Sequence, residues 1–380
     1  MRIAISGGGI AGLTLAAKLR QQGREPVVME RATEYQDVGY GIGLWPLGSS
    51  VFHGLGVHDE LMKLSVIPEV YEFGDHTGRI LQRVPMDAVG LEEDPIMSIA
   101  RYDLIDVLRS ACGDVDLRMG TTITAVEQAD DVVDIGLSTG ETLEVDLLVI
   151  SEGLHSTTRE LVFGPIEKFD THWFFWTWWA KPGRIPQTVM REYWGPGRTF
   201  AAFPCGDRIM VGAGFPSDSI GDPDAPPETI KTHIRDANSD LCAGDQTVAD
   251  LIDDAEEFFL WPMIDDRSSQ WSKGRVVLCG DAGTGFLPTA GVGASNALRS
   301  ASGLADELSR TGPKGVPLAL ELFEKRSRKI IEANQEDSRS LARMMFIENR
   351  ALNWARDQVL RHYPPTKMVD DIIESMKTPF

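Results

Sequence analysis

Three glycines near the N-terminus have the spacing of a dinucleotide-binding turn. Gly7, Gly9 and Gly12 form a G-x-G-x-x-G motif between a short apolar run and a helical pattern. In this motif the first glycine permits a tight turn, the second lets the backbone approach a pyrophosphate, and the third allows close packing of helix and strand. Glu30 follows at the end of the next apolar run, where a carboxylate can accept hydrogen bonds from ribose hydroxyls. The motif predicts an adenine dinucleotide site and leaves NAD and FAD open.

A second glycine-rich segment separates these two cofactors. Asp281 follows the apolar run 275–279, and an acid at a strand end can hydrogen-bond the hydroxyls of a polyol. The segment ahead of the next helix carries Pro288, Gly291, Val292 and Gly293. A glycine turn at a helix N-terminus can stabilise a delocalised anion, such as the N1/C2=O edge of a reduced flavin, through backbone N–H groups and the helix dipole. This combination favours FAD, with an ordinary strand-to-helix turn as the alternative for the segment.

Hydrophobic patterning predicts the elements that hold these residues. Residues 2–6 and 26–30 resemble buried strands on either side of a helix over 13–22, which is a βαβ unit with a right-handed crossover. From about 170 to 270, aromatic and β-branched runs alternate with turn residues, which is typical of a mostly antiparallel sheet. Further helices are expected over 101–112 and 293–310, and further strands over 132–137, 143–150 and 275–279.

We therefore predict an α/β protein with a Rossmann-like FAD-binding domain on a parallel sheet, an antiparallel-sheet substrate domain and C-terminal helices. Because strands of the first type return late in the chain, the FAD-binding domain is expected to be discontinuous. Its predicted parts are 1–70, 98–165 and 270–340; the substrate domain would comprise 71–97 and 166–269; and the C-terminal helical segment would be 341–380.

The order and spacing of these motifs resemble the class A FAD-dependent aromatic hydroxylases, the p-hydroxybenzoate hydroxylase-like flavoprotein monooxygenases. The resemblance covers most of residues 1–340. It rests on GGGIAG with Glu30-Arg31, the segment Gly39 to Leu44, Arg101-x-x-Leu104, Glu152-Gly153 ahead of Ser156 and Arg159, and Gly280-Asp281-Ala282 followed by Pro288. It implies reduction by NAD(P)H and hydroxylation of a hydrophobic, aromatic or polycyclic small molecule with O2 through a flavin C4a-hydroperoxide.

The resemblance also implies roles for individual residues. It assigns the ADP half of FAD to Gly7, Gly9, Gly12 and Glu30. The full set of expected cofactor-binding residues is Gly7, Gly9, Ala11, Gly12, Glu30, Arg31, Gly43, Arg101, Asp281, Pro288, Gly291, Val292 and Gly293. Arg159 belongs to a segment that the family uses for both FAD and NAD(P)H. The chain departs from the family pattern at Glu152, where Asp is usual, at Thr284, and at Ser300, where an acid is common.

An aromatic run, Trp173-Phe174-Phe175-Trp176-Thr177-Trp178-Trp179, holds four of the nine tryptophans. Read as a strand, it is apolar on both faces, and one face is expected to pack on the core. The simplest interpretation is a strand buried on both sides. The functional interpretation is that rings of one face, with Trp176 and Trp178 as candidates, line an apolar substrate pocket over the flavin.

Composition argues against several other functions. A formal net charge of −20 and a pI near 4.8 oppose binding to nucleic acid or to anionic membranes. The four cysteines form no CxxC pair and the seven histidines show no HxH or HExxH spacing, so no metal site is predicted. Neither a signal peptide nor a long apolar run is present in the sequence, so we expect a cytoplasmic protein without stable membrane association.

Other functions of the same fold stay open. One is an FAD oxidase or dehydrogenase, or a halogenase-like enzyme, although the Trp-x-Trp-x-Ile-Pro signature is absent because Trp179-Ala180 follows Trp178. Another is a non-redox flavin-dependent cyclase or a ligand-sequestering protein. The sequence identifies no catalytic residue, and it leaves the substrate, the choice of NADH or NADPH and the oligomeric state open.

Overall fold

The computed structural model describes residues 1–36, 40–86, 90–91 and 94–362. Apolar runs build a parallel sheet around β1 (Ile3–Ser6), which pairs with β2 (Val27–Glu30) and β13 (Leu147–Ile150). All residues of β1 and β13 are buried, as expected of strands that are covered on both faces. The outer strands are β9 (Asp116–Met119), β20 (Val276–Leu278) and an antiparallel edge strand, β19 (Ser272–Lys273).

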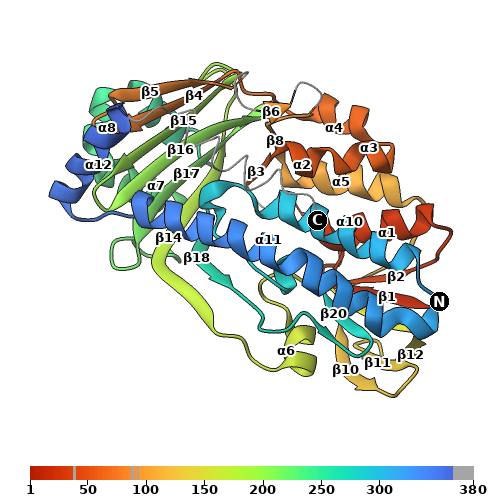
Figure 1. Cartoon of the computed structure of the whole chain (residues 1–380). Helices are drawn as coiled ribbons and strands as arrows, with labels where there is room; N and C mark the ends of the chain where they lie inside the picture. Colours follow the sequence, from red (N-terminus) through yellow and green to blue (C-terminus); the bar gives the residue numbers. More distant parts are fainter. Residues whose placement is uncertain (37–39, 87–89, 92–93, 363–380) are drawn as a thin grey trace.

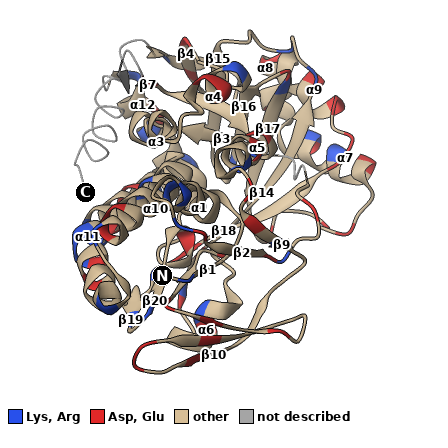
Figure 2. Cartoon of the chain, turned by 90° about the vertical axis from the view of Figure 1, so that its right-hand side faces the viewer, with Lys and Arg blue, Asp and Glu red and all other residues tan. Residues whose placement is uncertain are grey.

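Helices cover one side of the parallel sheet and a small sheet covers the other (Figures 1 and 2). α1 (Ile10–Gln21) packs against α5 (Arg101–Cys112) and α10 (Gly293–Ser309). The predicted βαβ unit is therefore confirmed, with its helix beginning earlier than expected, directly after the glycines. The small sheet, next to α6 (Thr157–Phe163), consists of β10 (Ile123–Gln128), β11 (Val133–Leu137) and β12 (Thr142–Val145).

A second large sheet stands beside the first. All of its neighbouring strands are antiparallel except β15 and β4, which pair in parallel. Much of the antiparallel sheet predicted between residues 170 and 270 is present in it. In order across the sheet its strands are β18 (Phe259–Asp266), β14 (Lys168–Ala180), β17 (Arg208–Pro216), β16 (Arg198–Cys205), β15 (Val189–Gly195), β4 (Val70–Asp75) and β5 (Ile80–Pro85).

Three helices interrupt this sheet in sequence, and the sequence analysis did not foresee them. They lie between β17 and β18 and are α7 (Pro227–Ala237), α8 (Ser239–Gly244) and α9 (Gln246–Asp253). Ile230 and Ile234 are buried on one side of α7, and Val248, Leu251 and Ile252 are buried on one side of α9. This three-and-four-residue spacing is the signature of an amphipathic helix, and these apolar stripes pack on one face of the second sheet.

A two-stranded ribbon lies between the two large sheets. β3 (Gly41–Leu44) pairs with β8 (Met97–Ala100), β3 packs against α10, and β8 packs against β16. The short elements nearby are β6 (Gly90–Leu91), β7 (Asp94–Pro95), α2 (Pro46–Ser49), α3 (Val51–Leu55) and α4 (His58–Leu64). The ribbon therefore brings residues after Tyr40 into contact with both halves of the molecule.

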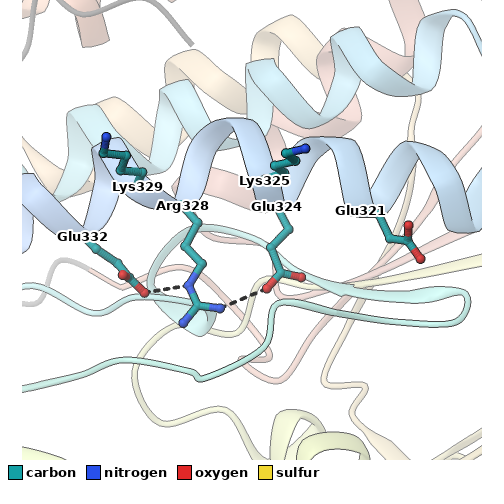
Figure 3. A pocket seen from close by; sticks show the side chains of 6 residues that line it. All are labelled: Glu321, Glu324, Lys325, Arg328, Lys329 and Glu332. Carbon is teal, nitrogen blue, oxygen red and sulfur yellow. Dashed lines mark hydrogen bonds and ion pairs between the residues drawn. The ribbon is translucent and has the colours of Figure 1, made fainter.

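The C-terminal part of the chain is helical, as predicted for 341–380, as far as the structure describes it. α11 (Val316–Met345) runs along the molecule and α12 (Arg350–His362) follows, whereas 363–380 and Gly39 lie outside the described residues. Lys325 and Lys329 are exposed on α11, and Arg328 lies 3.1 Å from Glu324 and 2.7 Å from Glu332 (Figure 3). Because both charge signs line this surface pocket, it offers no simple anion site. Among the described residues, no helix is long and apolar enough to cross a membrane.

Candidate functional site

The first glycine turn has the backbone contacts that its motif predicts. Gly7 has φ +103° and a β-carbon there would lie 2.4 Å from the carbonyl oxygen of Ser151, while one at Gly12 would lie 1.9 Å from that of Gly7. Gly9 differs, because a β-carbon there would have no atom within 4 Å. No side chain caps the N-terminus of α1 beside it. The turn therefore offers open space and free N–H groups to an anion such as a pyrophosphate.

Glu30 is held beside this turn by backbone hydrogen bonds. Its carboxylate accepts the N–H groups of Gly8 at 2.8 Å and Ala32 at 2.9 Å. The Tyr35 hydroxyl donates to the carbonyl of Gly8 at 2.8 Å and covers the same loop. A carboxylate has further lone pairs, so Glu30 can still accept ribose hydroxyls. Arg31, the next residue, is exposed.

The second motif meets the first at Gly280. A β-carbon at Gly280 would lie 2.7 Å from that of Ala11, so the loop after β20 touches the start of α1. Asp281 follows this contact, and burial, with a smaller contribution from Asp266, raises the pKa of its carboxyl to about 7. The Ser300 hydroxyl accepts the N–H of Gly280 at 3.3 Å, which gives a structural role to that departure from the family pattern.

Protonation of Asp281 is expected to make the stability of the FAD-free protein pH-dependent. Because its folded pKa is about 7 and its unfolded pKa is about 4, folding takes up a proton between these values. The contribution is fully present below pH 4 and is lost as the pH rises through 7. Urea unfolding at pH 5 and pH 8 measures this effect. Between these two pH values the free energy of unfolding should change by roughly 2 kcal/mol less in Asp281→Asn than in the wild type, a figure reduced for the partial exposure of Asp281. Equal pH dependence in both proteins would contradict this assignment.

The second glycine turn lies where the ribbon reaches the parallel sheet. The 3₁₀ turn Pro288–Ala290 leads to Gly291, whose φ of +63° favours glycine, and Val292 precedes α10 without a side-chain cap. A β-carbon at Gly43 would lie 3.9 Å from the Gly291 carbonyl oxygen, and one at Gly291 would lie 3.6 Å from the indole nitrogen of Trp45. The uncapped N-terminus of α10 at Gly293 is thus bordered by β3 and by an aromatic ring.

Arg101, the first residue of α5, lies beside Tyr40. Its backbone N–H donates to the Tyr40 carbonyl at 3.2 Å, and its guanidinium carbon lies 5.9 Å from the centre of the Tyr40 ring. Burial raises the pKa of Tyr40, with Arg101 lowering it and Asp281 raising it. The Tyr40 ring meets Trp261 edge-on at 5.1 Å between centroids. Arg101, Asp281 and the ring of Trp261 are therefore neighbours of the same tyrosine.

Arg159 has a structural position that differs from the family expectation. It is 2% exposed and forms an ion pair with Asp266 at 2.8 Å. It also donates to the carbonyls of Leu154 and Ala282 at 3.0 Å each. These contacts tie α6 to the loop that carries Asp281, so Arg159 holds this loop rather than facing an open site.

Glu152, which stands where the family usually has Asp, connects the end of β1 with the start of α6. Its carboxylate accepts hydrogen bonds from the hydroxyls of Ser6, Ser156 at 2.7 Å and Thr158 at 2.5 Å. It also accepts the backbone N–H of Thr158 at 3.1 Å. The longer side chain thereby connects the end of β1 with the start of α6.

The proposed substrate side chains Trp176 and Trp178 point the other way. Both are buried, and their indole N–H groups donate to the carbonyls of Ile220 at 3.0 Å and Leu251 at 2.8 Å. They belong to the apolar core between the second sheet and helices α7 to α9. The structure corrects the prediction that they line a pocket with the cofactor motifs, because the unforeseen helical layer covers that face.

The opposite face of the sheet meets the cofactor motifs instead. Phe175 and Trp261 are only partly buried there, and the Trp261 indole N–H donates to the Thr177 hydroxyl at 2.9 Å. Tyr71, from β4 on the same face, packs with Trp45 in one apolar cluster. Strand alternation in the sequence separates these two faces, but choosing between them needs the three-dimensional arrangement.

Two histidines also meet a carboxylate outside this region. The Nε2 atoms of His53 and His58 lie 3.3 and 3.6 Å from Oδ1 of Asp94, and these ligand atoms all fall within 4.8 Å of one another. The two rings stack with centroids 3.6 Å apart and planes inclined by 16°. A metal bound by imidazole lies in the ring plane, and two nearly parallel planes share no point close to both rings. The arrangement therefore links α3, α4 and β7 without forming a coordination centre.

Comparison with known proteins shows the family of this chain. Residues 1–338 match the family model described as FAD binding domain. The chain belongs to that family. The chain is 29% identical over 336 residues to 6-hydroxynicotinate 3-monooxygenase of Pseudomonas fluorescens, covering 85% of this chain and 86% of the relative. A 3-amino-4-hydroxybenzoate 2-monooxygenase of Streptomyces platensis is 31% identical over 317 residues, covering 81% and 79%.

Solved structures agree on the fold of this FAD-binding family member. HpxO of Klebsiella pneumoniae, complexed with FAD and uric acid, superimposes with a TM-score of 0.88 at 20% identity, covering 99% of this chain and 96% of that one. The predicted α/β fold, the FAD cofactor, the class A aromatic hydroxylase family and the FAD-dependent monooxygenase class are confirmed. The individual cofactor residues stay predictions, which the geometry of the two turns supports.

Proposed function

We propose that this FAD-dependent monooxygenase consumes NAD(P)H and O2 and hydroxylates a hydrophobic aromatic or heteroaromatic small molecule. The observation that carries the proposal is that two uncapped helix N-termini, each after a glycine turn, lie near the same aromatic face of the second sheet. The loop after β20 contacts the first of these helices where Gly280 meets Ala11. The relatives act on hydroxynicotinate and aminohydroxybenzoate according to their names, and this supports an aromatic substrate class. The oxygen-transfer route expected from the sequence stays a prediction.

Each part of the site has a physical task toward FAD. The open space at Gly9 and the N–H groups of α1 would hold the pyrophosphate, and Glu30 would accept the adenosine ribose hydroxyls. Asp281 would bind the ribityl chain, and the turn at Gly291 would place N–H groups beside the flavin ring. Bound FAD supplies the redox chemistry with NAD(P)H and O2.

The protein's remaining task is to hold the substrate and to exclude water. Phe175, Trp261 and Trp45 present partly buried rings on the side of the second sheet that faces the turns. Burying a flat apolar ligand against them gains about 25 cal/mol per Å² of apolar surface. Rings in offset or edge-on contact also orient a planar substrate. This face, rather than that of Trp176, is the proposed substrate wall.

Anaerobic stopped-flow reduction followed by oxygen mixing tests the proposal. The purified protein should be yellow with FAD, and a matching aromatic ligand should accelerate its reduction by NADH or NADPH. After oxygen is added, one hydroxylated product should form per NAD(P)H oxidised. Oxygen uptake that yields only hydrogen peroxide with every ligand would instead indicate an oxidase. Absence of both NAD(P)H oxidation and oxygen uptake would indicate a non-redox flavoprotein.

A further inference from the structure

A carboxylate stands on the proposed substrate wall. Glu192 on β15 lies on the same sheet face as Tyr71 on β4, since these strands pair in parallel and Tyr71 is aligned with Met190. The Tyr71 hydroxyl donates to Oε2 of Glu192, and the indole N–H of Trp194 donates to Oε1 at 2.7 Å. Each carboxylate oxygen therefore already accepts one hydrogen bond, which fixes the orientation of the group.

Glu192 has no cationic partner among the residues that the structure describes. Burial raises its pKa, and the only groups that oppose this shift are Tyr71 and Trp194. Glu72, on the opposite face of the neighbouring strand, shows the contrast, since it pairs with Arg83 at 3.0 Å and Arg191 at 2.7 Å. A carboxylate in a poorly solvated place without a cation repels a second anion strongly.

A shared apolar cluster links Tyr71 to the region of the second glycine turn. Tyr71 and Trp45 both pack against the buried residues Val84 and Ile96. The indole nitrogen of Trp45 would lie 3.6 Å from a β-carbon at Gly291. Glu192 and Tyr71 are both only partly buried, whereas Phe73 and Trp194 on the same face are buried. Protein therefore covers the pair itself incompletely, while it covers the neighbouring residues of that face.

We propose that Glu192 and Tyr71 set the substrate class of this enzyme: an aromatic or heteroaromatic molecule that presents an O–H or N–H donor and carries no carboxylate. The Tyr71 oxygen donates its own proton to Glu192 and keeps lone pairs that accept a donor from the substrate. A carboxylate on the substrate would face Glu192 without compensation, and such repulsion is an effective way to reject a ligand. The inference rests on the proposed function, since it concerns the ligand of that site.

Two matched ligand pairs test this selection in the purified FAD-bound protein. 2-Hydroxypyridine is compared with 6-hydroxynicotinate, and 2-aminophenol with 3-amino-4-hydroxybenzoate, so the members of each pair differ by one carboxylate. Binding is followed by the change in FAD absorbance, which does not depend on turnover. The wild type should bind the member without a carboxylate roughly tenfold or more tightly.

Variants separate charge from hydrogen bonding. Glu192→Gln should bring each pair to within about threefold, mainly through tighter binding of the acids. Tyr71→Phe should weaken binding of the donor-bearing ligands and keep the discrimination against acids. Glu69→Gln removes an exposed carboxylate next to β4 and should behave as wild type.

Several outcomes would overturn the inference. Equal or tighter binding of the acids by the wild type contradicts it, as does an unchanged ratio in a Glu192→Gln protein that retains FAD and its melting temperature. If Glu192→Gln loses FAD, the inference is tested instead by the wild-type affinity ratios of the two ligand pairs and by ligand binding to Tyr71→Phe. A failure to bind any of the four ligands contradicts the proposed substrate class. Failure of the proposed function appears separately, as the absence of FAD or of NAD(P)H oxidation.

Discussion

Replacing Arg159 by methionine is expected to lower the free energy of unfolding by about 3–5 kcal/mol. The change removes the cation of a buried ion pair and leaves Asp266, which is fully buried, without compensation. It also leaves the carbonyls of Leu154 and Ala282 without their donors. Chemical unfolding of the purified variant, followed by tryptophan fluorescence, measures the loss.

A double variant distinguishes the charge effect from simple loss of packing. Arg159→Met with Asp266→Asn removes both charges and should recover a large part of the stability, because no uncompensated carboxylate stays buried. FAD affinity should fall in the single variant, since Arg159 holds the loop that carries Asp281 through Ala282. A single variant as stable as wild type, with unchanged FAD affinity, would contradict the positioning role.

Replacing Trp178 by alanine is also expected to cost about 3–5 kcal/mol of unfolding free energy. Its ring is fully buried between the second sheet and the helices α7 to α9, where it meets Phe200 and Phe258 edge-on. Truncation leaves a cavity and deprives the Leu251 carbonyl of its indole donor. Variant molecules that stay folded should bind substrate with an unchanged KM.

Phe175→Ala is the matched change on the other face of the same strand. Its ring is only partly buried, so the loss of stability should be smaller than for Trp178→Ala. If the proposed substrate wall is correct, the KM for an aromatic substrate should rise, or NAD(P)H oxidation should become uncoupled from product formation. The opposite pattern, with Trp178→Ala affecting only substrate binding, would restore the assignment made from the sequence.

The glycine motif and the buried strands of this protein could be predicted from its sequence, because they depend on local backbone geometry and burial. Positions 7 and 12 require glycine because backbone atoms crowd the place of a β-carbon there. This local requirement appears in the sequence as the G-x-G-x-x-G motif. The apolar runs that form β1, β13 and β20 are covered on both faces, which gives them an unbroken hydrophobic pattern. The α/β fold and the FAD cofactor could therefore be predicted from the sequence.

Only the tertiary structure decided which side of the second sheet faces the two glycine turns. Strand alternation assigns Trp176 and Trp178 to one face and Phe175 to the other, but a period of two carries no information about what covers each face. The covering layer comes from α7 to α9, about fifty residues further along the chain. Glu192 and Tyr71 meet only through the pairing of β15 with β4, which are far apart in sequence. Sequence patterns record the local backbone requirements of a residue, whereas contacts between distant strands exist only once the chain has folded.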